Sequence, residues 1–556
     1  MNKKQINEQL KYDKLLCENL VKPLGIDNTN PRFSWIFSSE SRSTNQTAYR
    51  VIVSSSKEKL KNNNTDIWDS GKVETDESTN INYSGQKLKS NKRYWWKVKC
   101  RDNQNNWTSY SKPTWFETGL LKSSDWKGSW IGTGNDNKIS APLLRNVFTL
   151  DKEVAEARLY ISGLGYYELY LNGKKVGDHV LDPVWTDYGP REMNDLNYPI
   201  NDKMSHRVKY VKYNVTNLLN YNKNALGVIL GNGWYNQRQR LAEGKFWYGY
   251  PRMILQLQIK YEDGSVEIIK SDENWKVSAS PIIYNNIYTG EIYDARREID
   301  GWHNKNFDCS DWKQAQVMEP PGGKMVSQLC PPDRKINKLK PDKVINPEHG
   351  VYIFDLGQNI SGWIKMQVKG AAGTKVQLRY AEEITENGYL DFSSAGGQGQ
   401  IQQDSYILKG EGEETYEPRF TWHGFRYVEV TGYPGTPSCD DITGILVHSD
   451  VEETGEFECS QEMFNEIFNL YKWAQKTNFQ GGVPSDCPHR ERLGYTGDGQ
   501  LTAEASIYSF DMVNFYRKWI DDIADCQGEE SGHVQHTAPF AGGGGGPGAW
   551  GCAYSL

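Results

Sequence analysis

The sequence predicts a multidomain protein that is mostly β-sheet and ends in helices. Apolar and polar side chains alternate through long stretches, as from Arg93 to Cys100, and a period of two marks strands with one buried face. Near Ser460 the period of the apolar residues changes to 3.6, which marks helix. At about 150 residues per domain, a chain of 556 residues has room for three or four domains.

Residues 1–119 are predicted to form a β-sandwich of the fibronectin III or immunoglobulin kind. Tyr49, Val51 and Val53 share one face of a strand, with polar or charged residues between them. The run Trp115–Gly119 ends on a glycine, as a final strand would.

Residues 120–328 are predicted to form a second β domain of the jelly-roll kind, and its first residues, Leu120–Trp130, are interpreted as a linker. Asn172-Gly173 is the strongest short signal for a hairpin turn, and residues 225–230 form a buried strand candidate. Four acids in this region are candidates for a sugar or calcium site, although capping of turns is the favoured interpretation: Asp182, Asp187, Glu291 and Asp294.

A third β domain is predicted over residues 329–450. Its strands, such as Trp363–Val368 and Lys375–Tyr380, are punctuated by glycines. The segment Tyr352–Asn359 is interpreted as a buried turn rather than as a contact with the following domain.

The last region, 451–556, begins with two predicted helices. Ser460 is the expected cap of the first, and the second spans Asp511–Cys526 with Asp511 as its cap. The apolar face of the first comprises Met463, Phe464, Ile467, Phe468, Tyr471 and Ala474, and the solvated face of the second is expected to carry Asp521, Asp522 and Asp525. Five glycines follow at 542–546. Because two amphipathic helices cannot bury their faces alone, the domain is predicted to be incomplete; a glycine-rich tail on a finished protein is the alternative.

Composition excludes several classes of function. A net charge of −7 argues against nucleic-acid and anionic-membrane partners. The charged segment Met1–Lys14 lacks the apolar run of a secretory signal, and no stretch approaches the roughly 20 apolar residues of a membrane span. Nine scattered cysteines without a CxxC pair favour reduced thiols over disulfides or a zinc site. We therefore predict a cytoplasmic protein without a metal site.

The densest group of chemically active residues lies in Pro484–Asp498. Three acids, two arginines and a tyrosine stand close together in a stretch punctuated by proline and glycine, which predicts a loop between the two helices. Glycoside hydrolysis needs a carboxylic acid to protonate the leaving oxygen and a second carboxylate on the opposite face of the sugar. Neighbouring carboxylates raise the pKa of such an acid, whereas arginines lower it. The alternative is a surface loop whose charges are paired in solvent.

Many short stretches, in order along the chain, resemble the bacterial α-L-rhamnosidases of glycoside hydrolase family 78. They are Asn30–Trp35, Gln46–Tyr49, Trp68–Lys72, Gly163–Tyr166, Leu181–Tyr188, Leu230–Tyr235, Tyr288–Arg296, Phe354–Asn359, His423–Tyr427 and Asp486–Gly494. The resemblance covers the whole chain and corresponds to the N-terminal two-thirds or so of such enzymes. It implies a concanavalin-like third domain, an (α/α)6-barrel catalytic domain in last place, and an inverting mechanism without a cofactor.

The resemblance also implies roles for individual residues. Glu491 matches the general acid, and Asp486 and Asp498 match acids that bind the sugar hydroxyls and support it. Arg490 matches a sugar-binding arginine. Two aromatic residues complete the expected sugar pocket: Trp550 matches a wall of it, and Tyr495 stands where the family usually has tryptophan. The family's general base is a glutamate further downstream, and no residue of this chain can be assigned to it.

The resemblance predicts removal of terminal α-L-rhamnose from glycosides or oligosaccharides. Without a base, the chain alone is expected to hydrolyse rhamnosides poorly, because a general acid–base group contributes roughly 10²–10⁴-fold. Three other interpretations stay open: a binding protein that holds rhamnose-containing glycans without cutting them, an inactive fragment, and a helical-barrel enzyme that cuts another sugar.

Overall fold

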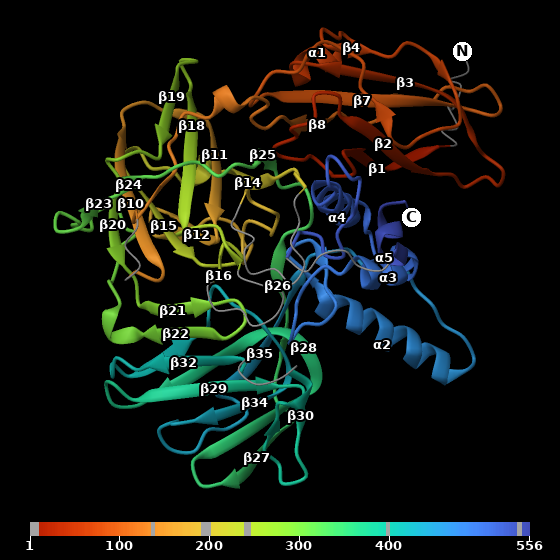
Figure 1. Cartoon of the computed structure of the whole chain (residues 1–556). Helices are drawn as coiled ribbons and strands as arrows, with labels where there is room; N and C mark the ends of the chain where they lie inside the picture. Colours follow the sequence, from red (N-terminus) through yellow and green to blue (C-terminus); the bar gives the residue numbers. More distant parts are fainter. Residues whose placement is uncertain are drawn as a thin grey trace, which may run out of the picture. The chain divides into compact units, whose positions relative to one another are not determined.

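The computed structural model (Figure 1) describes residues 10–134, 139–190, 202–237, 246–395, 401–541 and 548–555. The glycine run at 542–546 lies outside the described residues. The chain divides into two compact units, Met1–Lys127 and Gly128–Leu556. All nine cysteines are free, as the sequence predicts. No helix in the described part of the chain combines the length and the apolar character needed to cross a membrane.

The first unit contains two small antiparallel sheets. One has the order β1-β2-β6 and the other β4-β3-β7-β8, with β5 paired to β3. Their bounds are β1 Lys11–Cys17, β2 Arg32–Ser38, β3 Gln46–Ser54, β4 Trp68–Asp69, β5 Val73–Glu74, β6 Ile81–Asn82, β7 Arg93–Asp102 and β8 Thr114–Glu117. Phe33 of β2 packs 4.6 Å from the ring of Trp96 on β7 and 5.8 Å from Phe116 on β8, so the core joins both sheets. The short helix α1 (Lys57–Lys61) is capped by Ser56.

The second unit begins with the jelly-roll-like pair of sheets that the sequence predicts. The described residues form a six-stranded sheet, β13-β12-β15-β10-β20-β23, and a seven-stranded one in which β24-β9-β18-β11-β14-β25 are joined by β19. The bounds are β9 Ile131–Gly132, β10 Pro142–Leu150, β11 Val154–Leu164, β12 Tyr166–Leu171, β13 Lys174–Lys175, β14 Arg207–Asn214, β15 Asn222–Gly231, β18 Arg252–Tyr261, β19 Val266–Lys270, β20 Lys276–Ala279, β23 Lys313–Gln314, β24 Gln316–Val317 and β25 Lys324–Ser327. Asn172 and Gly173 have φ of 53° and 86°, so the predicted hairpin turn between β12 and β13 is confirmed.

A ten-stranded sheet follows, with the order β21-β22-β32-β29-β34-β28-β35-β26 among the described residues and with β27 and β33 paired to β28 (Figure 1). Its bounds are β21 Ile282–Asn286, β22 Gly290–Asp294, β26 Asp333–Leu339, β27 Lys343–Glu348, β28 Val351–Lys369, β29 Lys375–Ala381, β32 Gln403–Ile407, β33 Glu413–Tyr416, β34 His423–Thr431 and β35 Ile442–Ser449. The expected turn at Tyr352–Asn359 is wrong: the segment belongs to the long strand β28. Asn359, the last residue of this segment, also contacts the helical region: Trp473 Nε1 donates to its carbonyl over 2.7 Å.

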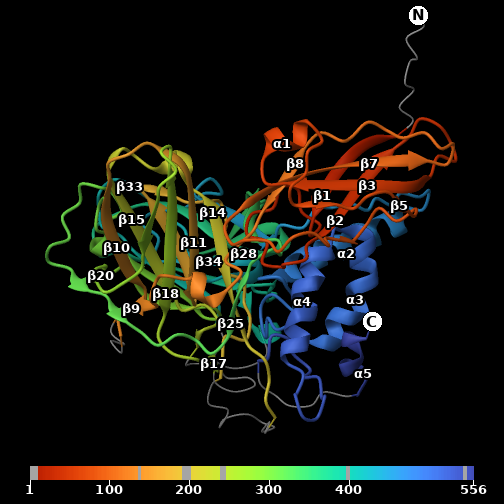
Figure 2. The same ribbon diagram turned by 90° about the horizontal axis from the view of Figure 1, so that it is seen from above.

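The helical segment contains α2 (Glu462–Asn478), α3 (Thr496–Ser509), α4 (Val513–Asp525) and the short α5 (Gly548–Gly551). Figure 2 shows α2, α3 and α4 grouped beside one another. The two predicted helices are confirmed, but their caps are not: Gln461 and Met512 take the cap positions without side-chain bonds. Helix α3 was not predicted, and it begins within the stretch predicted to be a loop.

Candidate active site

The residues Ser485–Tyr495, here called the acidic loop, connect a small hairpin to α3. The hairpin pairs β36 (Phe479–Gln480) with β37 (Val483–Pro484). Two hydrogen bonds close the loop on itself: Asp486 N donates to Leu493 O, and Leu493 N donates to Asp486 Oδ1, each over 3.0 Å. The chain between these residues therefore turns back sharply and presents its side chains together.

Two carboxyls and a thiol meet inside the acidic loop. One ligand atom from each of Asp486, Cys487 and Glu491 lies within 4.8 Å of the others. Cys487 Sγ is 3.1 Å from Asp486 Oδ2 and 3.1 Å from Glu491 Oε2. The sequence prediction placed Asp486 beside Glu491 as a supporting acid, and the two side chains are indeed adjacent.

The surroundings of the two carboxyls shift their pKa values in opposite directions. Burial raises the pKa of Asp486, and its hydrogen bond with Glu491 raises it further. Burial alone would also raise the pKa of Glu491, but hydrogen bonds from Arg490 and Cys487 outweigh it and hold that pKa below its usual value. The contact with Asp486 lowers the pKa of Glu491 in the same direction as the arginine does, so the surroundings favour Asp486 over Glu491 as the carboxyl that holds a proton.

A metal ion would compete with these contacts. Within the described residues, Asp486, Cys487 and Glu491 are the only group whose atoms could surround an ion. Burial raises the pKa of the Cys487 thiol, so it stays protonated, and metal binding requires the thiolate. Arg490 Nε also donates a hydrogen bond to Glu491 Oε2, so a metal ion would have to displace the arginine from this oxygen. The chemistry of this donor set fits proton sharing better than metal ligation.

Arg490 and Asp498 lie at the open side of the acidic loop. The Arg490 side chain is 46% exposed while it pairs with Glu491. Asp498 stands in the first turn of α3 and is exposed. Partial burial of its carboxyl raises its pKa, and the charge of Glu491 adds to the shift. Both side chains are accessible to a ligand that approaches Glu491.

Three aromatic rings form a wall next to the start of α3. The ring of Tyr495 lies 5.7 Å from that of Trp550, edge to face, and 5.7 Å from that of His536, stacked at 22°. Gly497 makes this possible, since a Cβ there would fall 2.5 Å from the Trp550 indole. The structure therefore joins the two aromatic residues singled out in the sequence. It adds His536, which no pattern in the sequence marked for such a role.

Arg492 ties the acidic loop to the β region. Its side chain is fully buried, although its backbone has a φ of +59°. Nη1 donates to the carbonyls of Ile287 and, over 2.6 Å, Trp422; Nη2 donates to Gln402 Oε1 over 2.6 Å. Burial lowers the pKa of Arg492 to about 10. Every acceptor comes from a segment far away in sequence, which is why the sequence analysis gave this arginine no role.

Further contacts from the β region fix the loop. Tyr288 OH donates to the carbonyl of Glu491 over 3.1 Å. At Gly424 the loop passes so closely that a Cβ would lie 2.7 Å from the carbonyl carbon of Pro488 and 2.8 Å from His489 N. Because a larger residue would push the loop outward, Gly424 is needed for close approach rather than for an unusual backbone angle.

Buried acids connect the β strands to the helical segment as well. Asp333 of β26 accepts hydrogen bonds from Gly481 N, at the hairpin before the acidic loop, and from Ser449 Oγ over 2.7 Å. Burial raises the pKa of Asp333 to about 7. An acid of β26 therefore holds the backbone of the hairpin that precedes the acidic loop.

The predicted solvated face of α4 is corrected in part. Asp521 is exposed, but Asp522 and Asp525 are buried. Asp522 pairs with Lys518 over 2.6 Å, and Asp525 accepts from Arg207 Nη2 over 2.6 Å. A helix wheel could not reveal this, because Arg207 is supplied by β14, far away in sequence.

The four acids considered for a second sugar or calcium site lie in separate surroundings. Asp294 caps the short helical turn Ala295–Arg297 by accepting from Arg296 N, in agreement with the favoured interpretation as a turn cap. Asp182 bonds with His179, Tyr213 and Gln328, and Asp187 accepts from Tyr248 OH over 2.7 Å. Glu291 is fully buried and accepts from Tyr416 OH and Arg419 N. Each acid thus has its own protein partners.

β-rich domains ahead of a helical segment with clustered carboxyls define a class, the multidomain glycoside hydrolases. Four family models match in succession: the Rha78A-like N-terminal immunoglobulin domain (12–122), the α-L-rhamnosidase N-terminal domain (152–337), the bacterial α-L-rhamnosidase concanavalin-like domain (345–448) and the bacterial α-L-rhamnosidase 6 hairpin glycosidase domain (452–556). The chain belongs to the bacterial α-L-rhamnosidases of glycoside hydrolase family 78. The boundaries predicted at 119, 328 and 450 stay predictions.

The relatives agree with this assignment. An α-L-rhamnosidase of Formosa agariphila is 38% identical over 96% of this chain and 58% of its own length, and one of Streptomyces avermitilis is 30% identical over 96% and 67%. The structure of the α-L-rhamnosidase from Dictyoglumus thermophilum matches with a TM-score of 0.90 and 43% identity, over 98% of this chain and 60% of that one. A structure of the Streptomyces avermitilis enzyme complexed with L-rhamnose also matches at 0.90, with 30% identity over 98% of this chain and 68% of that one. The chain thus spans about 60% of the length of several relatives.

Proposed function

We propose that the chain supplies the proton-donating half of an inverting α-L-rhamnosidase site that acts on rhamnose-containing glycosides, with Glu491 as the general acid. The observation that carries this proposal is the contact of Asp486 and Glu491 around Cys487 in a loop held from the β region by Arg492. A fixed acid that retains a proton near neutral pH is what protonation of a leaving oxygen requires.

The route of the proton follows from the contacts of Glu491. In the resting site, hydrogen bonds from Arg490, Cys487 and Asp486 favour the ionised form of Glu491, and we assign the proton of the pair to Asp486. The Arg490 side chain is half exposed, so sugar hydroxyls can draw its N–H groups away. Glu491 then loses its charge partner, its pKa rises, and it takes the proton from Asp486 before passing it to the glycosidic oxygen.

The aromatic wall suits the sugar ring. Rhamnose lacks the hydroxyl at its sixth carbon, so it presents a methyl group that is best placed against an apolar surface. Trp550, Tyr495 and His536 offer such a surface beside the acids. We assign Asp498 and Arg490, which flank the opening, to the sugar hydroxyls.

The base of an inverting reaction has to come from elsewhere. The acid and base of an inverting glycosidase stand about 6.5–9.5 Å apart, on opposite faces of the sugar, with a water between one of them and the ring. Asp486 and Glu491 stand side by side, each with an oxygen 3.1 Å from Cys487 Sγ, and cannot flank a sugar ring in this way. We therefore place the base in the part of the relatives' length that this sequence does not span.

The experiment uses methyl α-L-rhamnoside, whose alkoxide cannot leave without a proton from a general acid, and the 556-residue chain. Without a base, hydrolysis is expected to be about 10²–10⁴-fold slower than by a full-length relative. Sodium azide, a small nucleophile that can occupy the place of the missing base and its water, is expected to restore turnover and to yield β-L-rhamnosyl azide. Glu491→Gln should abolish the azide-dependent turnover, whereas Glu466→Gln, on the exposed face of α2, should retain it.

Two outcomes would overturn the proposal. Fast hydrolysis without azide that is lost in Glu491→Gln would mean that the chain holds its own base. Rhamnoside binding with no turnover, with or without azide, would favour a glycan-binding protein.

A further inference from the structure

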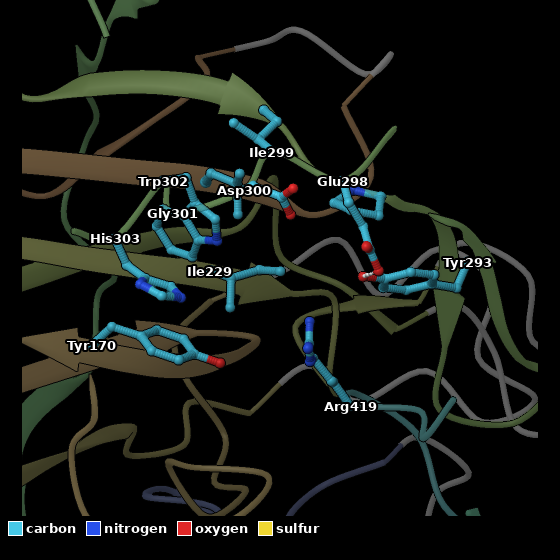
Figure 3. A pocket seen from close by; sticks show the side chains of 12 residues that line it. Tyr170, Ile229, Tyr293, Glu298, Ile299, Asp300, Gly301, Trp302, His303 and Arg419 are labelled. Carbon is cyan, nitrogen blue, oxygen red and sulfur yellow. Dashed lines mark hydrogen bonds between the residues drawn. The ribbon is translucent and has the colours of Figure 1, made fainter. Parts of the chain in front are cut away.

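A cavity lies away from the acidic loop, where the six-stranded sheet meets the ten-stranded one. It has a volume of about 180 Å³, and Figure 3 shows the side chains that line it. Tyr170 comes from β12, Tyr293 from β22, and Arg419 from the connection between β33 and β34. The segment Glu298–His303 closes one side. No residue of the acidic loop takes part.

One wall of the cavity is aromatic. The rings of Tyr170 and His303 stack at 4.9 Å, and Trp302 meets Tyr170 edge to face at 5.6 Å. The backbone that carries Trp302 is fixed by the buried Arg145, whose Nη1 donates to Trp302 O over 2.9 Å and whose Nη2 donates to Asn304 O over 2.7 Å. The wall is therefore built before any ligand arrives.

The other side carries polar groups with unused hydrogen-bonding capacity. Figure 3 shows the guanidinium of Arg419 directed into the cavity. Its Nε lies 3.5 Å from Glu168 Oε2, and its two Nη atoms donate to no acceptor among the described residues. The Asp300 carboxylate likewise has no hydrogen bond or ion pair within the described part of the chain. Glu298, by contrast, is already bonded to Tyr293 OH and Lys409 Nζ, each over 2.9 Å.

We propose that this cavity is a second saccharide site that holds one neutral pyranose ring. The aromatic wall suits the C–H face of a sugar, the free N–H groups of Arg419 donate to ring hydroxyls, and Asp300 accepts from them. The lining carries two carboxylates and one guanidinium, so a phosphate or a carboxylated sugar is disfavoured. The cavity volume of about 180 Å³ leaves room for one sugar ring.

This site would retain a glycan while the acidic loop acts on another of its sugars. It does not depend on Glu491, so the two proposals can fail separately.

The test measures saturation-transfer NMR on the full chain carrying Glu491→Gln. The probes are methyl α-L-rhamnopyranoside, methyl α-D-glucopyranoside and methyl β-D-galactopyranoside, each alone at millimolar concentration. For at least one of them, Asp300→Ala is expected to weaken binding about tenfold, since a hydrogen bond to a charged group is lost. Trp302→Leu should weaken binding of the same sugar. Asp311→Ala, which removes another exposed carboxylate of this region, should leave it unchanged.

A thermal melt checks that each variant is folded, and Asp300→Ala, at an exposed position, is the decisive variant. Binding that is equal in Asp300→Ala and Asp311→Ala for all three sugars would overturn the proposal, because any remaining signal would then arise at the acidic loop.

Discussion

The jelly-roll sheets and the helical segment bury their apolar side chains to very different degrees. Leu159 and Leu257 in the sheets have no exposed surface. On the helices, Leu470 is 68% exposed and Leu501 is 84% exposed. The sheets thus have a closed core, whereas the described helices leave apolar side chains uncovered.

This contrast shows where the acidic loop obtains its rigidity. The loop belongs in sequence to the helical segment, yet the groups that hold it come from the closed side. Arg492 bonds to Ile287 and Trp422, and Tyr288 bonds to Glu491. The β region is therefore a structural part of the candidate active site and not only an accessory to it.

The largest expected effect comes from Arg492→Met, which breaks the connection between the two regions. The change leaves the carbonyls of Ile287 and Trp422 without a donor inside the protein, which should cost about 3–5 kcal/mol of unfolding free energy. Arg490→Met, two residues away but half exposed, should cost less than about 0.5 kcal/mol. Urea unfolding of both variants checks this, and equal losses would contradict an anchoring role.

The next effect tests the contrast in burial directly. Leu257→Ala removes a fully buried side chain of β18 and should cost about 2–4 kcal/mol. Leu470→Ala, on the exposed face of α2, should change the unfolding free energy by no more than about 0.5 kcal/mol. Thermal and urea unfolding of the pair provide the measurement. A large loss for Leu470→Ala would mean that the helical face is covered in solution, for example by a second copy of the chain.

Local patterns sufficed to predict much of the fold. Alternation identified the strand from Arg93 onward, and Asn172-Gly173 identified the hairpin between β12 and β13. Both signals come from neighbours in sequence. The helix α3 escaped because Thr496–Ser509 contains two glycines and no continuous apolar stripe. Such a segment is held by tertiary contacts, as where Tyr471 OH bonds to Ser506 Oγ over 2.9 Å.

For the candidate site, the sequence predicted which residues belong to it but not the state of their carboxyls. The motif brought Asp486 and Glu491 together, and the structure places them in contact. The opposite pKa shifts of Asp486 and Glu491 depend on burial and on the Arg490 geometry, neither of which a motif contains. The burial of Asp525 against Arg207 was out of reach for the same reason, since the two are 318 positions apart.

The smallest expected effect is a pH dependence at Asp333, the buried acid that holds Gly481. Its folded-state pKa of about 7 lies above the usual value for an aspartate, so the folded chain binds a proton that the unfolded chain releases. The stabilisation from this proton is complete at low pH and is lost as the pH rises from about 4 to 7. Asp333→Asn keeps a neutral side chain at all pH values. It should therefore reduce the loss of unfolding free energy between pH 5 and pH 8 by about 1–3 kcal/mol. Urea unfolding of the wild type and the variant at both pH values measures this difference. Parallel pH profiles would show that Asp333 stays ionised in the folded chain, and that its carboxylate, rather than a neutral carboxyl, accepts the Gly481 hydrogen bond.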